Sequence, residues 1–250
     1  MDQRKHWDKI GSRYDSEIFN VFKSDKNQLL TKYFSRHSNS NDVAIDFGCG
    51  TGKAFPYLSP AFKSVLGIDI SSELLTSIKL NKYENVTVKR ADLSSGSLVF
   101  PPADFVFCCN VIMLPEVAKN IAMIQNIHKA LVPNGDAIIV LPSLESVMYS
   151  SWQLIELYKR KGIKPEKIPS SEFSYYKGLR DILQGIIYIE KVPTKHYSES
   201  EIKVIFGNAG LIITAIEKLE YKWDTEFEAP PRWMKAPFPW DWLVECKKIN

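Results

Sequence analysis

Short apolar runs alternate with helix-patterned segments through the first three-fifths of the chain, and this alternation constrains the fold more than any other feature. It is typical of a parallel sheet, because each pair of parallel strands needs a crossover connection and that connection is usually a helix. Helices are predicted at 72–82 and 115–131, where apolar residues recur at helical spacing. Strands are predicted at 43–48, 64–70, 86–92, 104–112 and 136–143.

The pattern changes after the fifth predicted strand. Ser198 and Glu201 form a capping box, which predicts a helix ending near Gly207 or Gly210. We therefore expect an α/β, Rossmann-like, doubly wound sheet of seven strands. It should be mostly parallel, with an antiparallel last strand at its edge and a helical and loop insertion after strand five. The remaining predicted segments are a helix at 144–161, a loop at 162–178, an extended segment at 185–192 and strands at 211–221 and 241–249.

The composition is that of one globular domain. The chain has 250 residues, 45% of them hydrophobic, and 32 basic residues against 29 acidic ones. A net charge of +3 is too balanced to indicate a nucleic-acid surface, which carries a basic stripe. No apolar run approaches the ~18 residues that span a bilayer, and the polar N-terminus does not resemble a signal peptide. We therefore expect a cytoplasmic protein without a membrane segment.

The four cysteines do not indicate a metal or redox site. Cys49, Cys108, Cys109 and Cys246 lack the C-x-x-C spacing of such sites. Cys108 and Cys109 are neighbours on a predicted strand, so their side chains should point to opposite faces. We expect all four to be reduced, and we expect no metal ligand among them.

The most specific motif is DFGCGTGKA at residues 46–54, directly after the first predicted strand. A phosphate-binding P-loop needs glycine where Phe47 stands and Ser or Thr where Ala54 stands, so that class is excluded. A dinucleotide turn needs G-x-G-x-x-G, and the spacing here is one residue too short. The loop therefore favours a different nucleotide-like cofactor, and Lys53 is interpreted as a solvated helix residue beside it.

Residues 46–52 resemble the first motif of the class I S-adenosylmethionine-dependent methyltransferases, an acidic residue followed by G-x-G-x-G after strand one. The resemblance covers about residues 40–145, including HKALVPNGDAIIV, which is similar to the family's helix, turn and fifth strand. It implies that S-adenosylmethionine lies across the strand ends and leaves as S-adenosylhomocysteine. The glycines would keep side chains clear of the ligand. The loop residues implied in cofactor binding are Asp46, Gly48, Cys49, Gly50 and Gly52.

The resemblance assigns further cofactor contacts to the later strand ends. Asp69 would accept the ribose hydroxyls and Ile70 would lie against the adenine. Asp92 and Leu93 would contact the adenine edge, and Asn110 would lie near the methionine moiety and the methyl group. Each polar residue also has a plainer interpretation, in which the two aspartates cap a strand end or turn and Asn110 is a polar strand terminus.

The motifs do not identify the methyl acceptor. Strand four ends in Cys109-Asn110-Val111-Ile112, unlike the N-P-P-[YF] sequence of methyltransferases acting on base nitrogens. We therefore expect a small-molecule acceptor, methylated at oxygen, nitrogen or carbon by in-line displacement. A general base is needed only if the nucleophile arrives protonated. A protein or RNA methyltransferase, and a non-catalytic S-adenosylmethionine-binding protein, are the alternatives, and the oligomeric state is left open.

The chain is expected to form a single domain, 1–250, in which two regions supply the acceptor site. An N-terminal helical lid would occupy 1–40 and a substrate-cover insertion would occupy 144–197. Between them lies the cofactor-binding core, 41–143, and the last helix and strands occupy 198–250.

Particular residues of the two regions are candidates for the site. Tyr14 of the lid is predicted to approach the methionine end of the cofactor, or else to pack the helix down with Trp7. His196 is the candidate base, or else an anchor for the helix that follows it. The predicted substrate residues of the insertion are Tyr149, Trp152, Tyr175 and Tyr176, which could instead form the core of the cover.

Overall fold

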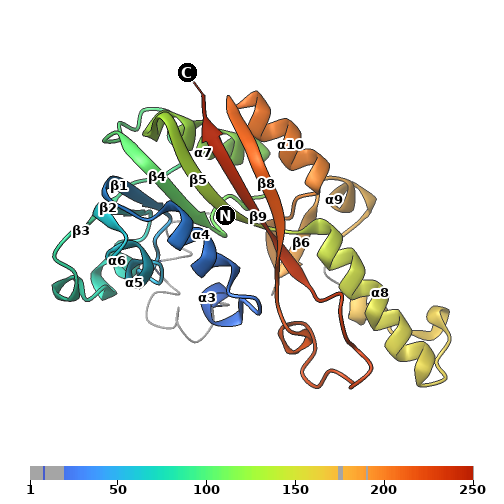
Figure 1. Cartoon of the computed structure of the whole chain (residues 1–250). Helices are drawn as coiled ribbons and strands as arrows, with labels where there is room; N and C mark the ends of the chain where they lie inside the picture. Colours follow the sequence, from blue (N-terminus) through green and yellow to red (C-terminus); the bar gives the residue numbers. More distant parts are fainter. Residues whose placement is uncertain (1–7, 9–19, 174–176, 190, 250) are drawn as a thin grey trace.

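The computed structural model describes residues 8, 20–173, 177–189 and 191–249. Its main sheet has seven strands in the order β3-β2-β1-β4-β5-β9-β8, which Figure 1 shows as one twisted layer. The first five strands pair in parallel, and β9 is antiparallel to both of its neighbours. The strands are β1 (Asn39–Phe47), β2 (Phe62–Asp69), β3 (Val86–Arg90), β4 (Ala103–Cys109), β5 (Leu131–Pro142), β8 (Leu211–Glu220) and β9 (Trp240–Lys248).

The predicted fold class is confirmed, but the antiparallel strand is not at the edge. β9 lies between β5 and β8, so β8 is the edge strand. The difference follows from side-chain character, because Trp242–Val244 and Cys246 of β9 are apolar and buried, whereas Glu217 and Lys218 of β8 are charged and exposed. A charged, half-exposed strand suits a sheet edge, where one side remains open to water.

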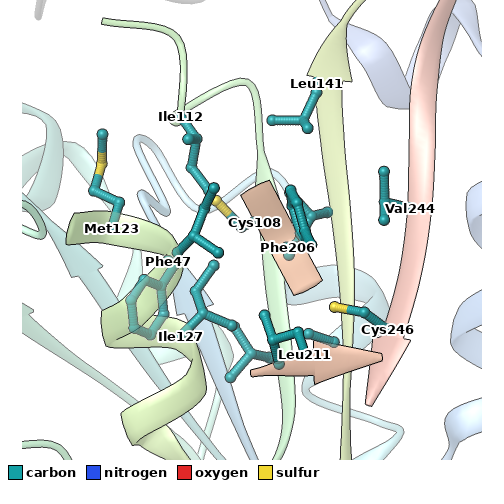
Figure 2. Close-up of a cluster of buried hydrophobic side chains, with 14 of the residues drawn as sticks. Phe47, Cys108, Ile112, Met123, Ile127, Leu141, Phe206, Leu211, Val244 and Cys246 are labelled. Carbon is teal, nitrogen blue, oxygen red and sulfur yellow. The ribbon is translucent and has the colours of Figure 1, made fainter. Parts of the chain in front are cut away.

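Helices cover both faces of the sheet. α7 (Val117–Ala130) and α10 (Glu199–Asn208) pack on one face, and Figure 2 shows Met123, Ile127 and Phe206 meeting strand residues there. The other face is covered by α3 (Val21–Ser24), α4 (Leu29–His37), α5 (Phe55–Leu58) and α6 (Ser72–Ser77).

Neighbouring cysteines of β4 confirm the predicted alternation along that strand. Cys108 belongs to the cluster under α7, while Cys109 packs against the opposite cluster. All four cysteines are free thiols.

The insertion after β5 is built from helices and a small hairpin. It begins with α8 (Leu144–Arg160), then two 3-10 turns at Pro165–Lys167 and Ser170–Phe173, then α9 (Leu179–Leu183). The extended segment predicted at 185–192 is instead the first arm of a hairpin, β6 (Ile186–Ile189) with β7 (Val192–Lys195). The chain reverses beside Lys191, whose φ of 70° lies in the left-handed region.

One helix boundary and one strand boundary also differ from the prediction. The helix predicted at 72–82 ends at Ser77 and is followed by a 3-10 turn at Leu80–Lys82. The strand predicted at 136–143 begins earlier, because residues 132–135 are part of β5, with Asn134 at φ 64° and a register shift against β4. No helix in the described ranges is long and apolar enough to cross a membrane.

Candidate active site

A cleft of about 1470 Å³ opens at the carboxyl edge of the parallel strands. Its lining comes from the ends of β1, β2, β4 and β5 and continues beneath α8 and the β6–β7 hairpin. This is the edge at which open α/β sheets bind ligands, because the loops that follow the strands diverge there. The start of β9 reaches the same edge, since Asp241 pairs with Pro142 at the end of β5.

The loop after β1 forms one wall of the cleft. Gly48, Gly50 and Gly52 have φ values of 77°, 53° and 79°, a conformation that strains residues with a Cβ. A Cβ on Gly48 would lie 2.1 Å from Val111 Cγ2, and one on Gly52 would lie 2.7 Å from the Phe55 ring. The glycines are therefore required by backbone conformation and by packing within the protein. Of the three, only Gly48 is among the described residues that line the cleft.

Asp69, at the end of β2, holds the glycine loop in place. Its Oδ2 accepts a 2.9 Å hydrogen bond from the Gly50 amide, and its Oδ1 accepts one of 2.9 Å from the Ser71 amide. Its side chain is 8% exposed, and burial raises its pKa although backbone N–H groups oppose that shift. Each carboxylate oxygen keeps a second lone pair for a ligand. The Ser71 hydroxyl also donates a hydrogen bond to Oδ1 of Asp8.

Asp46 places an unpaired carboxyl group in the same wall. Its side chain is 2% exposed, and Oδ2 accepts no hydrogen bond from the described residues. Burial, and then the nearby charge of Asp69, raises the pKa of Asp46 to about 8. A buried carboxyl without a partner is costly to ionise, and a cation bound in the cleft would offset that cost. The wall is therefore suited to a positively charged ligand group.

The ends of β2 and β3 form the next part of the lining. Ile70, Asp92 and Leu93, which the sequence analysis assigned to the adenine, all line the cleft. Asp92 is exposed and accepts hydrogen bonds from the backbone amide and the hydroxyl of Ser94. It therefore caps a turn, which is the alternative role that the sequence analysis gave it. The Leu93 carbonyl accepts a 2.9 Å hydrogen bond from Asn126 of α7, which fixes this turn against the helix.

Asn110 directly follows β4, in a left-handed conformation with φ 53°, and its amide N–H donates to the Val140 carbonyl of β5. Its Nδ2 donates a 3.2 Å hydrogen bond to Asp241 Oδ2, and the Tyr221 hydroxyl donates one of 2.7 Å to the same oxygen. Burial raises the pKa of Asp241 to about 6, although these two hydrogen bonds lower it. The sequence analysis missed Asp241 and Tyr221. The available signal was topological, because an antiparallel strand after β5 must begin at the carboxyl edge of the sheet.

His196 also lines the cleft, at the end of β7, and is 5% exposed. Its Nδ1 lies 3.1 Å from the Thr194 carbonyl oxygen. A carbonyl oxygen only accepts, so Nδ1 carries the proton and Nε2 presents a lone pair. Burial lowers the pKa of His196 to about 4, so the ring is neutral at physiological pH. His196 is therefore neutral, as a general base must be before it accepts a proton, and it forms part of the wall of the cleft.

Tyr149 and Trp152, two of the predicted substrate residues, are not brought into the cleft. The face of α8 toward the cleft carries Ser146, Val147 and Ser150, and helical spacing directs positions 149 and 152 away from it. Tyr149 packs against Trp223 and Trp240 with ring centroids 5.5 and 6.2 Å apart, and Trp152 is 52% exposed. Tyr149 therefore joins the insertion to Trp223 and Trp240, which lie outside it, whereas the alternative interpretation expected these aromatics to form the core of the cover itself. Tyr14, Tyr175 and Tyr176 lie outside the described residues.

Lys53 differs from its prediction as a solvated helix residue. It lies in the turn before α5, it lines the cleft, and its ammonium nitrogen is buried. The prediction was wrong because α5 begins two residues later, after the tight turn that the glycines create.

Part of the chain matches a known family. Residues 45–137 match the family model described as a methyltransferase domain. A Saccharomyces cerevisiae protein, named as probable S-adenosylmethionine-dependent methyltransferase CRG1, is 40% identical over 68 residues. That alignment covers 27% of this chain and 23% of the yeast protein.

Solved structures share the fold at low sequence identity. An S-adenosylmethionine-dependent methyltransferase from Mesorhizobium loti has a TM-score of 0.64 at 16% identity, covering 92% of this chain and 100% of the other. The N-methyltransferase NodS from Bradyrhizobium japonicum, in complex with S-adenosyl-L-homocysteine, has a TM-score of 0.62 at 11% identity, covering 100% of both chains. The chain therefore shares its fold, including the seven-stranded sheet, with these two solved methyltransferase structures.

Proposed function

We propose that the chain is a class I S-adenosylmethionine-dependent methyltransferase, that it binds S-adenosylmethionine at the carboxyl edge of the sheet, and that it methylates a small molecule. When bound, the cofactor supplies an electrophilic methyl group on a sulfonium. The chain's own task is then to orient the acceptor in line and to keep water out. S-adenosylhomocysteine is the product that leaves the same site.

The residues of the cleft fit the cofactor's charge. S-adenosylmethionine carries an ammonium and a sulfonium, and the wall at the glycine loop holds the buried, unpartnered Oδ2 of Asp46. Asp69, whose two oxygens keep free lone pairs beside Gly50 and Ser71, is suited to the ribose hydroxyls. Ile70 and Leu93 supply apolar surface for the adenine.

The continuity of the cleft is the observation that supports a small-molecule acceptor. A pocket for a single drug-sized ligand measures roughly 300–1000 Å³. The cleft of about 1470 Å³ exceeds that range and extends from the glycine loop to beneath α8 and the hairpin. It therefore has room for a second small molecule beside the cofactor, and the insertion covers the place that this molecule would occupy.

Calorimetry with S-adenosylmethionine and with S-adenosylhomocysteine tests the cofactor part of the proposal. We expect both ligands to bind to the same site, each excluding the other. Release of S-adenosylhomocysteine is then measured with three acceptor pools, namely cell metabolites below a small-molecule filter, total RNA and total protein. Turnover confined to the metabolite pool supports the proposal. Turnover only with RNA or protein would overturn the small-molecule acceptor, and binding without turnover in any pool would favour a non-catalytic binding protein.

A further inference from the structure

The part of the cleft beneath the insertion is acidic. We define the acceptor half as the lining from α8, the β6–β7 hairpin, residues 221–228 and the first two residues of β9. Asp241, Glu226 and Glu228 are carboxylates of this half, and no described lysine or arginine of those elements lines it. The cations that line the cleft, Lys53, Arg90 and Lys119, come from the glycine loop, β3 and α7. The three carboxylates of the acceptor half therefore lack a described cation from the same elements, whereas Asp46, Asp69 and Asp92 share the rest of the lining with three cations.

Asp241 is held in one orientation at the inner end of this half. Tyr221 and Asn110 both donate to its Oδ2, whereas Oδ1 accepts no hydrogen bond from the described residues. The Asn110 amide is fixed by the same contact, because only its NH₂ group can donate to a carboxylate. Its Oδ1 is consequently left as a second acceptor, buried and without a partner among the described residues. Asp241 Oδ1 and Asn110 Oδ1 are therefore both available to accept hydrogen bonds from the N–H or O–H groups of a ligand.

Trp240 supplies a second, independent sign of a ligand at this place. The residue lines the cleft and is 7% exposed, yet its indole N–H has no partner among the described residues. Such a buried polar group normally has a hydrogen-bond partner. The acceptor half is also lined by the aromatic residues Tyr188 and Phe227 and by the aliphatic Leu154. The acceptor half therefore combines unsatisfied polar groups with an apolar wall.

We propose that the acceptor is a nitrogen base carried on an apolar body, that its nitrogen binds beside Asp241, and that Asp241 Oδ1 receives the N–H proton. This inference rests on the methyl transfer proposed above and narrows the oxygen, nitrogen or carbon acceptor to nitrogen. The nitrogen lone pair forms the new C–N bond as the C–S bond breaks with its electron pair left on sulfur. The N–H proton then moves to Asp241 Oδ1, so every bond, electron pair and proton of the transfer is accounted for.

Charge development favours nitrogen over the other acceptors. A neutral nitrogen gains positive charge as it attacks, and the Asp241 and Glu226 carboxylates stabilise charge of that sign. A phenolate, a carboxylate or a carbanion would enter as an anion against these groups, which is unfavourable in a site partly closed to water. The same carboxylates thus attract one class of acceptor and repel the other.

Asp241 also has suitable acidity for this role. Burial raises its pKa to about 6, and the Glu226 charge adds to the rise. The other polar groups that face it are Tyr221, which directly follows β8, Asn110, which directly follows β4, and Cys109 of β4. Lys218 stacks on the outer side of Trp240 at 3.9 Å from the ring centroid and does not line the cleft. A carboxyl group with a pKa near neutrality can both accept the proton and release it to water afterwards.

Three probes of equal size test the inference, namely benzylamine, benzyl alcohol and benzoate. Each is titrated by ligand-observed NMR into the protein saturated with S-adenosylhomocysteine, a state in which no turnover occurs. We expect benzylamine to bind about tenfold more tightly than benzyl alcohol, and benzoate to bind most weakly. We expect Asp241→Asn to weaken benzylamine about tenfold while leaving benzyl alcohol and S-adenosylhomocysteine unchanged.

A pH series separates a charge contact from a structural role of Asp241. Benzylamine affinity should rise in the wild type between about pH 5 and about pH 7, as Asp241 ionises, and should be flat in Asp241→Asn. Asp224→Asn is the matched control, because Asp224 is exposed and does not line the cleft. Benzoate binding as tightly as benzylamine, no benzylamine signal, or an unaltered pH profile in Asp241→Asn would each overturn the inference. Failure of S-adenosylhomocysteine itself to bind would instead overturn the proposed function.

Discussion

The backbone amide of Gly50 donates a 2.9 Å hydrogen bond to Oδ2 of Asp69, so the end of β2 holds the loop that follows β1. The other oxygen of Asp69 holds the Ser71 amide at the start of α6 in the same way. One carboxylate therefore organises two loops at the carboxyl edge of the sheet. It also keeps the lone pairs with which a ribose would be bound, so loop shape and ligand binding are coupled.

This coupling predicts the effect of Asp69→Asn. The amide cannot accept on both sides, so one backbone N–H loses its partner and the ribose loses a charged acceptor. We expect the affinities for S-adenosylmethionine and S-adenosylhomocysteine to fall together, by about 10- to 100-fold, because hydrogen bonds to charged groups contribute about 1.5–3 kcal/mol. Calorimetry measures both affinities, with Asp224→Asn as an exposed control. A change in only one of the two affinities would contradict the ribose assignment, since both ligands carry the same ribose.

The acidity of Asp46 predicts proton release on cofactor binding. With a pKa raised to about 8 by burial, Asp46 is mostly protonated in the free protein at about pH 7. A bound cation stabilises the ionised form and lowers that pKa, so up to about one proton should leave per ligand. Calorimetry in buffers of different ionisation enthalpy counts the protons released. We expect Asp46→Asn to bind without that release, and an equal count in the variant would show that another group supplies the proton.

Gly48 offers a steric prediction with a matched control. In Gly48→Ala the new Cβ would lie 2.1 Å from Val111 Cγ2, at a φ of 77°. We expect a loss of about 2–4 kcal/mol in the free energy of unfolding, from overpacking together with the left-handed conformation. Gly96→Ala should change it by less than about 0.5 kcal/mol, because a Cβ there would meet nothing within 4 Å. Adding Val111→Ala should recover only the steric part, as measured by urea unfolding.

Two histidines predict opposite dependences of stability on pH. Burial lowers the pKa of His196 to about 4, so its contribution is lost as pH falls from about 6.5, where the unfolded residue titrates, toward 4. For His37, burial is outweighed by the carboxylates of Asp136 and Glu245, and its pKa is raised. Its contribution is therefore present below about pH 6.5 and is lost as pH rises through the folded pKa.

Urea unfolding of two variants at several pH values checks this difference. Relative to the wild type, His196→Gln should gain about 1–3 kcal/mol between pH 6.5 and pH 4.5. His37→Gln should be least stable relative to the wild type at low pH and should approach it as pH rises. Parallel curves for the two variants would show that neither pKa is shifted by the contacts described.

The glycine loop and the strand ends that follow it were predictable from local sequence. A strand, three alternating glycines and a helix lie within about one supersecondary unit, so spacing alone restricts what they form. The same local reasoning was wrong about Tyr149 and Trp152, because an aromatic-rich helix does not reveal which of its faces meets a ligand. Here those rings pack on Trp223 and Trp240, and small residues such as Ser146 and Val147 face the cleft.

The sequence by itself determined the doubly wound architecture, the glycine loop and the order of the candidate cofactor residues. These features depend on hydrophobic periodicity and on turn residues, which act over short distances along the chain. Only the tertiary structure decided that β9 lies inside the sheet and that Asp241 and Tyr221 meet Asn110 in the lining of the cleft. The physical reason is that strand order and the burial of polar groups depend on pairing between segments more than a hundred residues apart, which no local pattern encodes.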